Sequence, residues 1–283
     1  MSVPALPAVM LEPLVRAALL EDLGRAGDIT THAVVPAQAR AETALVARQA
    51  GVVAGLDLAA LAFRLIEPAI EIEVELPDGT RLQPGDRIAT IDGPARGVLT
   101  AERVALNFLG HLSGVASATA TLVEAVKGHK ARICCTRKTM PGLRAVQKYA
   151  VRVGGGANHR LGLDDAVLIK DNHVVAAGGI GPAIEAARAG IGHLVKIEIE
   201  VDTLDQLKQA LAVGVDAVLL DNMSPETLAE AVRLIDGRAI AEASGRITPA
   251  TAPAIAASGV DLISAGWLTH SAAVLDIGLD WRN

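Results

Sequence analysis

The stretch LVKIEIEVDTLDQLKQALAVGVDAVLLDNM, residues 194–223, decides the fold of this chain. Its two ends, 194–201 and 216–223, are short and apolar, as strands are when a sheet is covered on both faces. Between them, residues 203–214 carry apolar positions at helical spacing. A strand, a helix and a second strand in so short a span predict a βαβ unit with parallel strands.

The same alternation of strand and helix continues on both sides of this stretch. Further short apolar runs are ARICCT (131–136), AVLIKDNH (166–173), AIAEASG (239–245) and DLISAGWLTHS (261–271). About six such units in roughly 150 residues fit a closed or nearly closed α/β barrel better than an open doubly wound sheet. We therefore predict an α/β barrel domain over residues 113–273.

The first part of the chain follows a different pattern. We expect a helix over residues 4–23, short β pieces over 40–92 and a long helix over about 100–126. EIEVEL (71–76) alternates strictly, as a half-buried strand does, and the tail VLDIGLDW (274–281) alternates again. Residues 1–112 with 274–283 are thus predicted to form an α+β domain, with the tail as an edge strand of its sheet.

Composition limits the class of protein. The 283 residues carry 26 Lys and Arg against 32 Asp and Glu, and this net charge of −6 argues against a nucleic-acid or membrane-surface binder. Cys134 and Cys135 are adjacent, which suits neither a disulfide framework nor a zinc site and indicates a reducing compartment. We found no signal-peptide pattern and no apolar run near the roughly 18 residues of a membrane span, so we expect a cytoplasmic protein.

Working groups of α/β barrels lie at the carboxyl ends of the strands. The predicted strands end in Thr136-Arg137-Lys138, Lys170-Asp171-Asn172-His173, Glu198 and Glu200, Asp221-Asn222, Glu242-Ser244-Gly245, and Ser264-Gly266. One face of the barrel therefore collects cations from the early strands, carboxylates from the middle strands and Ser/Gly loops from the last two. EASG and SAGW match the usual phosphate site of barrels, although tight packing also explains either loop alone.

Several of these groups have two interpretations. Lys170 ends a buried strand and is expected to face the barrel mouth. Glu200 and Asp221 end neighbouring strands, so they either share one divalent cation or are neutralised by Lys196 and Lys170. Glu198 points inward by strand alternation, and we expect it to pair with a lysine inside the barrel.

Residues 136–160, TRKTMPGLRAVQKYAVRVGGGANHR, hold six Arg or Lys and no Asp or Glu. Such a run in an acidic chain predicts a strongly anionic ligand, with at least one phosphate and a metal. We expect Arg144, Lys148 and Arg152, at 4-residue spacing on one helix, to form a solvated face. The triple glycine at 154–156 is either a flexible connection or a means for backbone amides to approach an anion.

These motifs together resemble the quinolinate phosphoribosyltransferase family, also called carboxylating nicotinate-nucleotide pyrophosphorylases. The central segment 136–173 is similar to the family's signature. Two segments before it and three after it also occur in the family's order: EDLGRAGDITT, AERVALNFLGHLSGVAS, KIEIEV, EASGRI and LDIGLDW. The resemblance covers nearly the whole chain. It implies an α/β sandwich domain, an incomplete α/β (TIM-like) barrel, and obligate homodimers or hexamers.

The resemblance implies transfer of a phosphoribosyl group from PRPP to quinolinate, with loss of CO2, as a step of NAD biosynthesis. It places Arg137, Lys138, His159, Arg160 and Lys170 on the substrate, with Arg103 reaching in from the partner subunit. It also places Glu200 and Asp221 at the ribose and Mg2+, and Ser244, Gly245 and Gly266 at the phosphate. Lys170, Glu200 and Asp221 are the expected catalytic residues.

One residue departs from the family pattern. Arg246 stands where the family usually has a second glycine, so it either adds a phosphate contact or crowds the loop. The alternatives to quinolinate transfer are a paralogous phosphoribosyltransferase associated with molybdate transport, which has another acceptor, a Schiff-base aldolase using Lys170, and a non-catalytic phosphometabolite-binding protein.

Overall fold

The structure is a computed structural model that describes residues 3–282. Contacts divide the chain into two compact units. Unit 1 comprises Met1–Ala120, Met140–Gly155 and Thr269–Asn283, and unit 2 comprises Thr121–Thr139 and Gly156–Leu268. Within the described range, none of the helices has the length and apolar character that crossing a membrane requires.

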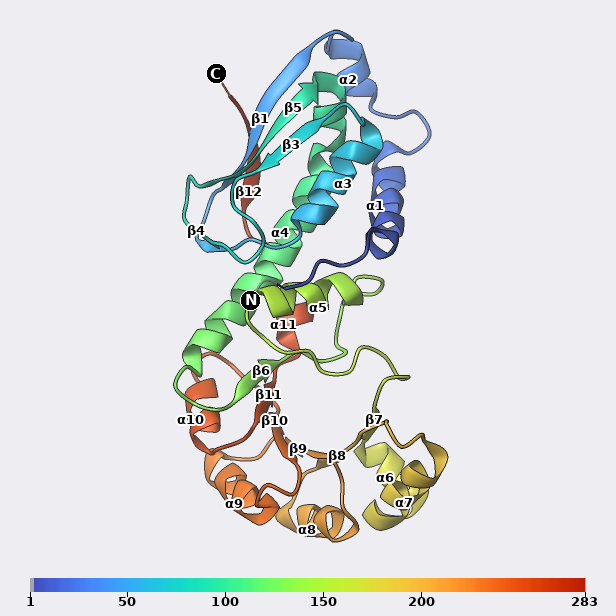
Figure 1. Cartoon of the computed structure of the whole chain (residues 1–283), viewed down its shortest axis with the longest axis vertical. Coiled ribbons are helices and arrows are strands. Elements are labelled where there is room, and N and C mark those ends of the chain that lie inside the picture. The colour runs from blue at the N-terminus through green and yellow to red at the C-terminus, as the bar shows by residue number, and fades with distance from the viewer. Residues whose placement is uncertain (1–2, 283) are drawn as a thin grey trace. The chain divides into compact units, whose positions relative to one another are not determined.

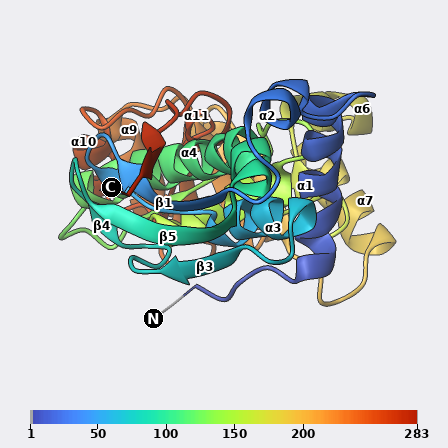
Figure 2. The same cartoon turned by 90° about the horizontal axis from the view of Figure 1, so that it is seen from above.

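Unit 1 contains an antiparallel sheet accompanied by helices (Figures 1 and 2). Its helices are α1 (Ala8–Leu23), α2 (Ile29–Val34), α3 (Leu56–Ile66), most of α4 (Ala95–Ala125) and α5 (Arg144–Val153). Its strands are β1 (Arg40–Ala47), β2 (Gly51–Val52), β3 (Glu71–Val74), β4 (Arg81–Leu82), β5 (Arg87–Pro94) and β12 (Ile277–Trp281). The four-stranded sheet has the order β12-β1-β5-β3, and β2 pairs with β4 separately.

The C-terminal tail completes the sheet of unit 1. Strand β12 pairs antiparallel with β1, with Ala44 opposite Asp280 and Ala47 opposite Ile277. The predicted return of the tail as an edge strand is therefore confirmed. The strand over EIEVEL is also confirmed as β3, but its expected half-burial is wrong, because Val74 is 46% exposed and β3 is the other edge of the sheet.

Unit 2 is a curved parallel sheet with helices on its outer side (Figure 1). Its strands are β6 (Arg132–Cys134), β7 (Val167–Ile169), β8 (Ile197–Val201), β9 (Ala217–Asp221), β10 (Ile240–Ser244) and β11 (Leu262–Ser264). Its helices are α6 (Asp171–Ala177), α7 (Ile180–Gly190), α8 (Leu204–Val213), α9 (Pro225–Ile235) and α10 (Ala252–Ala257), and α11 (Trp267–His270) follows β11. The strand order is β6-β11-β10-β9-β8-β7, so β6 and β7 are the two free edges of an incomplete α/β barrel.

Local sequence explains why the helices of unit 2 begin where they do. The Thr203 hydroxyl accepts the backbone N–H of Gln206 at 3.2 Å, and the side-chain oxygen Oε1 of Gln206 accepts the backbone N–H of Thr203 at 3.1 Å. This reciprocal cap begins α8 directly after β8. Ser224 accepts the Thr227 N–H in the same way, and Pro225 at the first position fixes the start of α9. Each strand of the predicted repeat is thus followed by a defined turn into its helix.

Packing groups the segment Met140–Gly155 with unit 1, whereas the predicted boundary at 112/113 follows the order of the chain. Helix α5, within this segment, buries Lys148 to 1% exposure. The expectation of a solvated face through Arg144, Lys148 and Arg152 is therefore wrong for Lys148. Arg152 is exposed, as expected. The spacing of charges could not reveal that α5 buries half of its residues, Lys148 among them.

Candidate active site

The carboxyl ends of the unit 2 strands surround a cavity of about 470 Å³. Strand register aligns three of its residues in one row, because Ser244 lies opposite both Asp221 on β9 and Ser264 on β11. The remaining lining residues are Thr136, Arg137, Lys138, His159, Arg160, Leu168, Lys170, Glu200, Leu219 and Glu242. The predicted collection of cations, carboxylates and serines at one end of the sheet is present in the structure.

One wall of the cavity is cationic. Arg137 and Arg160 are partly buried, and the Nε atom of each is buried without a hydrogen-bond partner. The Arg160 guanidinium donates from Nη1 to the Ala166 carbonyl at 2.9 Å. Burial, and then the charge of Arg137, lower the pKa of Arg160. Because unsatisfied buried N–H groups are costly, this wall fits an anionic acceptor of hydrogen bonds.

Carboxylates form the opposite part of the lining. Lys170 Nζ lies 2.6 Å from Glu200 Oε2, and Asp221 Oδ2 accepts the Asn222 side-chain amide at 2.5 Å. The expected neutralisation by Lys170 is therefore confirmed for Glu200. Lys196 does not take part, since it pairs with Asp216 at 2.6 Å instead.

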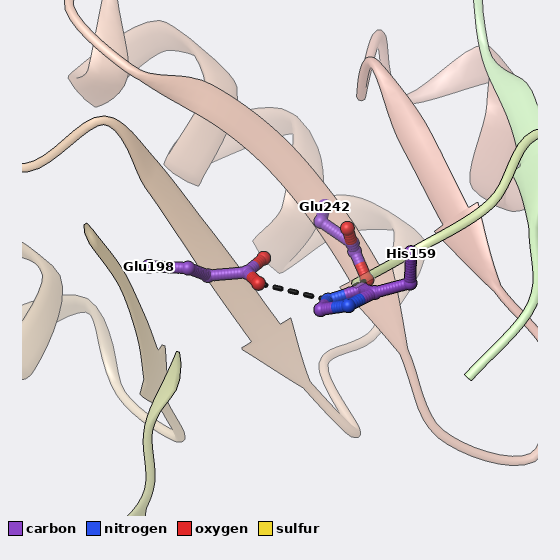
Figure 3. A group of neighbouring side chains, drawn as sticks. All are labelled: His159, Glu198 and Glu242. Atoms are coloured by element: carbon purple, nitrogen blue, oxygen red, sulfur yellow. Dashed lines mark hydrogen bonds and ion pairs between the residues drawn. The ribbon is translucent and has the colours of Figure 1, made fainter. Parts of the chain in front are cut away.

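The partner of Glu198 differs from the prediction. Glu198 is 8% exposed, and its Oε2 lies 2.8 Å from His159 Nε2, so the expected lysine partner is wrong. Glu242 Oε1, on β10, lies 3.7 Å from the same His159 nitrogen (Figure 3). The sequence predicted Glu242 only as a strand-end residue. Alternation placed Glu198 inside the barrel, but no local pattern showed that the loop residue His159 meets both glutamates.

The pKa of Glu242 is raised to about 7. Burial is the main cause and the charge of Glu198 the second, while His159 and the Ser264 hydroxyl act in the opposite direction. Ser264 Oγ donates a short hydrogen bond to Glu242 Oε1. Glu242 therefore holds a proton under conditions in which an ordinary glutamate has lost it.

This protonation makes the stability of the protein depend on pH. In the unfolded chain Glu242 loses its proton near its ordinary pKa of about 4.3, whereas the folded protein keeps it up to about 7. The contribution of Glu242 is thus fully present below the unfolded pKa and is lost as pH rises through the folded value. We expect the free energy of unfolding, from urea titrations at a series of pH values, to fall between these limits more steeply for the wild type than for Glu242→Gln. Equal slopes for the two proteins would contradict this prediction.

The predicted phosphate residues lie in two places. Ser244 lines the main cavity, whereas Gly245 and Arg246 line a second cavity of about 650 Å³ together with residues of α10 and the 222–225 turn. Gly245 has φ +103, and a Cβ there would meet Asn222 Oδ1 at 2.2 Å, so only glycine fits. Gly266 follows β11 and is in neither set of lining residues.

Arg246 has φ +50, in the left-handed region that side chains rarely adopt. Its conformation explains why a glycine suits this position. Because the left-handed conformation costs an ordinary residue roughly 1–2 kcal/mol, we expect Arg246→Gly to raise the free energy of unfolding by about 1 kcal/mol. Chemical denaturation measures this change, and a less stable variant would contradict the strain at Arg246.

The triple glycine has a packing role at its first member. A Cβ on Gly154 would lie 2.3 Å from the carbonyl oxygen of Ala116 on α4. Glycine is therefore required for the end of α5 to approach α4, which neither of the two sequence interpretations included. Arg103 also lies on α4 in unit 1, where it is exposed.

Comparison with known proteins identifies the family. Residues 28–113 match the family model for the quinolinate phosphoribosyl transferase N-terminal domain, and residues 115–280 match the model for its C-terminal domain. The chain belongs to the quinolinate phosphoribosyl transferase family.

Individual relatives in the quinolinate phosphoribosyl transferase family match this chain over nearly its full length. A nicotinate-nucleotide pyrophosphorylase (carboxylating) of Mycobacterium leprae is 48% identical over 271 residues, which cover 94% of this chain and 95% of the relative. A probable nicotinate-nucleotide pyrophosphorylase (carboxylating) of Bacillus subtilis is 42% identical, and the match covers 96% of this chain and 93% of the relative. The crystal structure of NadC from Streptococcus pyogenes has a TM-score of 0.94 at 42% identity, covering 99% of this chain and all of that one.

Proposed function

We infer that the protein transfers the phosphoribosyl group of PRPP to the ring nitrogen of quinolinate. The products are nicotinate mononucleotide, pyrophosphate and CO2. Family membership supports this activity. The single structural observation that carries it is the cavity lined by the cations Arg137, Lys138 and Arg160 beside the carboxylates Glu200 and Asp221.

The cationic wall suits the acceptor. Quinolinate carries two carboxylates on a planar ring, and guanidinium groups bind carboxylates through paired, planar hydrogen bonds. We assign Arg137, Lys138 and Arg160 to these carboxylates. His159 lines the same cavity, but both of its ring nitrogens already have protein partners, which are Glu198 and the Arg160 N–H. Its contribution to the acceptor site is therefore through Arg160 more than through its own ring nitrogens.

The carboxylate end of the cavity suits the donor. Glu200 and Asp221 offer hydrogen-bond acceptors for ribose hydroxyls, and Lys170 offers a positive charge next to them. Ser244 lies in register with Asp221, at the position expected for the 5-phosphate loop. Gly245, Arg246 and Gly266 continue that loop region, and we assign them to the same phosphate.

A divalent cation fits this end of the cavity. Glu200 and Asp221 present carboxylate oxygens, the hard ligands that Mg2+ takes in proteins together with substrate phosphates. When bound, Mg2+ would neutralise charge on the departing pyrophosphate. The ion pair between Lys170 and Glu200 shows that the protein already holds one positive charge at this place.

The chemistry asks the protein for positioning and charge stabilisation. The cationic wall orients the acceptor nitrogen toward the ribose carbon, and the carboxylates face positive charge that develops on the ribose as its bond to pyrophosphate breaks. No covalent nucleophile is required. Lys170 forms an ion pair with Glu200, so its side chain is engaged by a carboxylate, which disfavours the Schiff-base aldolase, since that reaction needs a free amine.

We further propose that the protein works as a homodimer in the cytoplasm, with Arg103 of one subunit completing the acceptor site of the other. Arg103 is exposed on α4, so it is accessible to a partner. The two cysteines are buried and not joined in a disulfide, as suits a reducing compartment. Light scattering measures the oligomeric state. Arg103→Ala should raise the KM for quinolinate and leave the oligomeric state unchanged.

The decisive experiment supplies the purified protein with quinolinate, PRPP and Mg2+ and measures nicotinate mononucleotide. Nicotinate, which lacks the 2-carboxylate, serves as the control acceptor and should give little product. Product from another base, with none from quinolinate, would move the assignment to the paralogous phosphoribosyltransferase. Calorimetric binding of PRPP without turnover would indicate a binding protein instead.

A further inference from the structure

His159, Glu198 and Glu242 form a largely buried group, of which His159 and Glu242 also line the main cavity (Figure 3). The two glutamates come from β8 and β10, and His159 comes from the loop that follows α5. Glu242 is 2% exposed and Glu198 8% exposed. Three ionisable side chains this deeply buried require a defined arrangement of protons, since unpaired charges are costly there.

The hydrogen bonds fix the proton of His159. Its Nδ1 lies 2.8 Å from the backbone nitrogen of Arg160, and a backbone N–H can only donate. Nδ1 therefore accepts, and the ring proton lies on Nε2. From there it is donated to Glu198 Oε2 at 2.8 Å.

The second glutamate lies close to the same histidine. Glu242 Oε1 lies 3.7 Å from His159 Nε2, and Glu198 Oε1 has no hydrogen-bond partner among the described residues. Burial and the nearby charge of Glu198 raise the pKa of Glu242, so Glu242 is the carboxyl of the two that keeps a proton. Ser264 fixes the Glu242 carboxyl by donating to Oε1.

The same proton arrangement argues against a metal ion in this group. The candidate ligand atoms of the three residues lie within 4.8 Å of one another, as metal ligands do. A histidine binds a metal through an unprotonated nitrogen, however, and here Nδ1 is used by Arg160 while Nε2 carries the proton. The group therefore contains a chain of hydrogen bonds from Glu198 through His159 to Arg160, and Glu242, which Ser264 fixes, lies beside His159.

We propose that Glu198 and Glu242 are positioning residues for the acceptor, which act by holding His159 and, through its Nδ1, the backbone of Arg160. This inference rests on the proposed function, since it assigns the acceptor to the Arg160 guanidinium. The strands β8 and β10 are rigid parts of the sheet, whereas Arg160 lies in a loop. The chain of hydrogen bonds transfers the rigidity of the sheet to the residue that must meet a planar dicarboxylate.

Matched variants of Glu198 and Glu242 test the proposal. Glu198→Leu and Glu242→Leu remove the two carboxyls that hold His159 and are expected to raise the KM for quinolinate about tenfold or more, with the KM for PRPP unchanged. Glu198→Gln keeps an acceptor for the His159 proton, and Glu242→Gln keeps a neutral polar side chain of the same shape beside His159. Both glutamine variants should therefore have a KM for quinolinate close to that of the wild type.

A second measurement does not depend on activity. The nitrogen chemical shifts of His159, assigned by comparison with His159→Asn, report which ring nitrogen carries the proton. The proposal requires Nε2–H and unprotonated Nδ1 in the wild type and in Glu198→Gln. A wild type that makes no nicotinate mononucleotide but shows this protonation would defeat the proposed function and leave the hydrogen-bond chain intact.

Three results would overturn the proposal. The first is a proton on Nδ1 of His159 in the wild-type protein. The second is an equal rise of both KM values in Glu198→Leu, or a rise of neither, because a merely structural role or none would give these patterns. The third is a Glu198→Gln variant as impaired as Glu198→Leu. If the leucine variants do not fold, the glutamine variants and the nitrogen shifts decide the question.

Discussion

Lys170→Met is expected to lower kcat for nicotinate mononucleotide formation by about 10²- to 10³-fold, the usual cost of losing one preorganised electrostatic group. The Lys170 ammonium lies at the end of β7 in the cavity, 2.6 Å from Glu200. In the proposed reaction, departure of pyrophosphate concentrates negative charge next to the Lys170 side chain in the transition state. Methionine keeps the length and the apolar stem of the side chain but removes the charge, so kcat should change more than the KM values. Pre-steady-state and steady-state kinetics with quinolinate and PRPP measure the effect.

Lys196→Met is the matched control for Lys170→Met. Lys196 also forms an ion pair at 2.6 Å, with Asp216, but it lies just before the start of β8 and is not in the lining of the main cavity. Its side chain is 76% exposed, so its removal should change neither kcat nor stability appreciably. If the two variants lose activity equally, Lys170 has no special place in the reaction.

Arg137→Ala is expected to raise the KM for quinolinate about 10- to 100-fold, because a hydrogen bond to a charged group contributes roughly 1.5–3 kcal/mol. Arg137 lines the main cavity together with Arg160, where the proposed reaction places a carboxylate of the acceptor. The charge of Arg137 also lowers the pKa of Arg160, which means that the two cations repel each other. We therefore expect the free protein to be no less stable after the substitution. Steady-state kinetics and thermal unfolding measure the two effects separately.

Arg132→Ala is the corresponding control for Arg137→Ala. Arg132 is exposed at the amino-terminal end of β6, the short strand that precedes Arg137, and it is not part of the cavity lining. An unchanged KM for quinolinate in Arg137→Ala would mean that Arg137 is only a surface residue. A loss of folding would mean that it supports the structure instead.

Much of unit 2 followed from sequence, because its signals are local. Apolar strands and capped helices alternate with a short period, and a cap such as Thr203 with Gln206 is visible in four residues. The sequence also placed cations and carboxylates at one end of the sheet, because parallel strands put their carboxyl ends on one side. In unit 1 the alternation of VLDIGLDW correctly indicated a returning strand.

What the sequence did not predict depends on contacts between distant residues. Strand alternation indicates that Glu198 points inward, but not that the loop carrying His159 meets it, since the two are 39 residues apart. Lys148 has the spacing of a solvated residue, and only the packing of α5 buries it. The partner of Lys196 was missed for the same reason, because Asp216 reaches it only across neighbouring strands.

The pairing of β12 with β1 also constrains when the protein can fold. Arg48, which follows β1, and Asp280 of β12 form an ion pair and are 232 residues apart in the chain. During synthesis β1 and its neighbour β5 leave the ribosome early, and the other edge of β1 stays unpaired until β12 emerges. The sheet of unit 1 is therefore finished only after β12 has been made, so its closure is a late step that leaves a bare strand edge open to aggregation meanwhile.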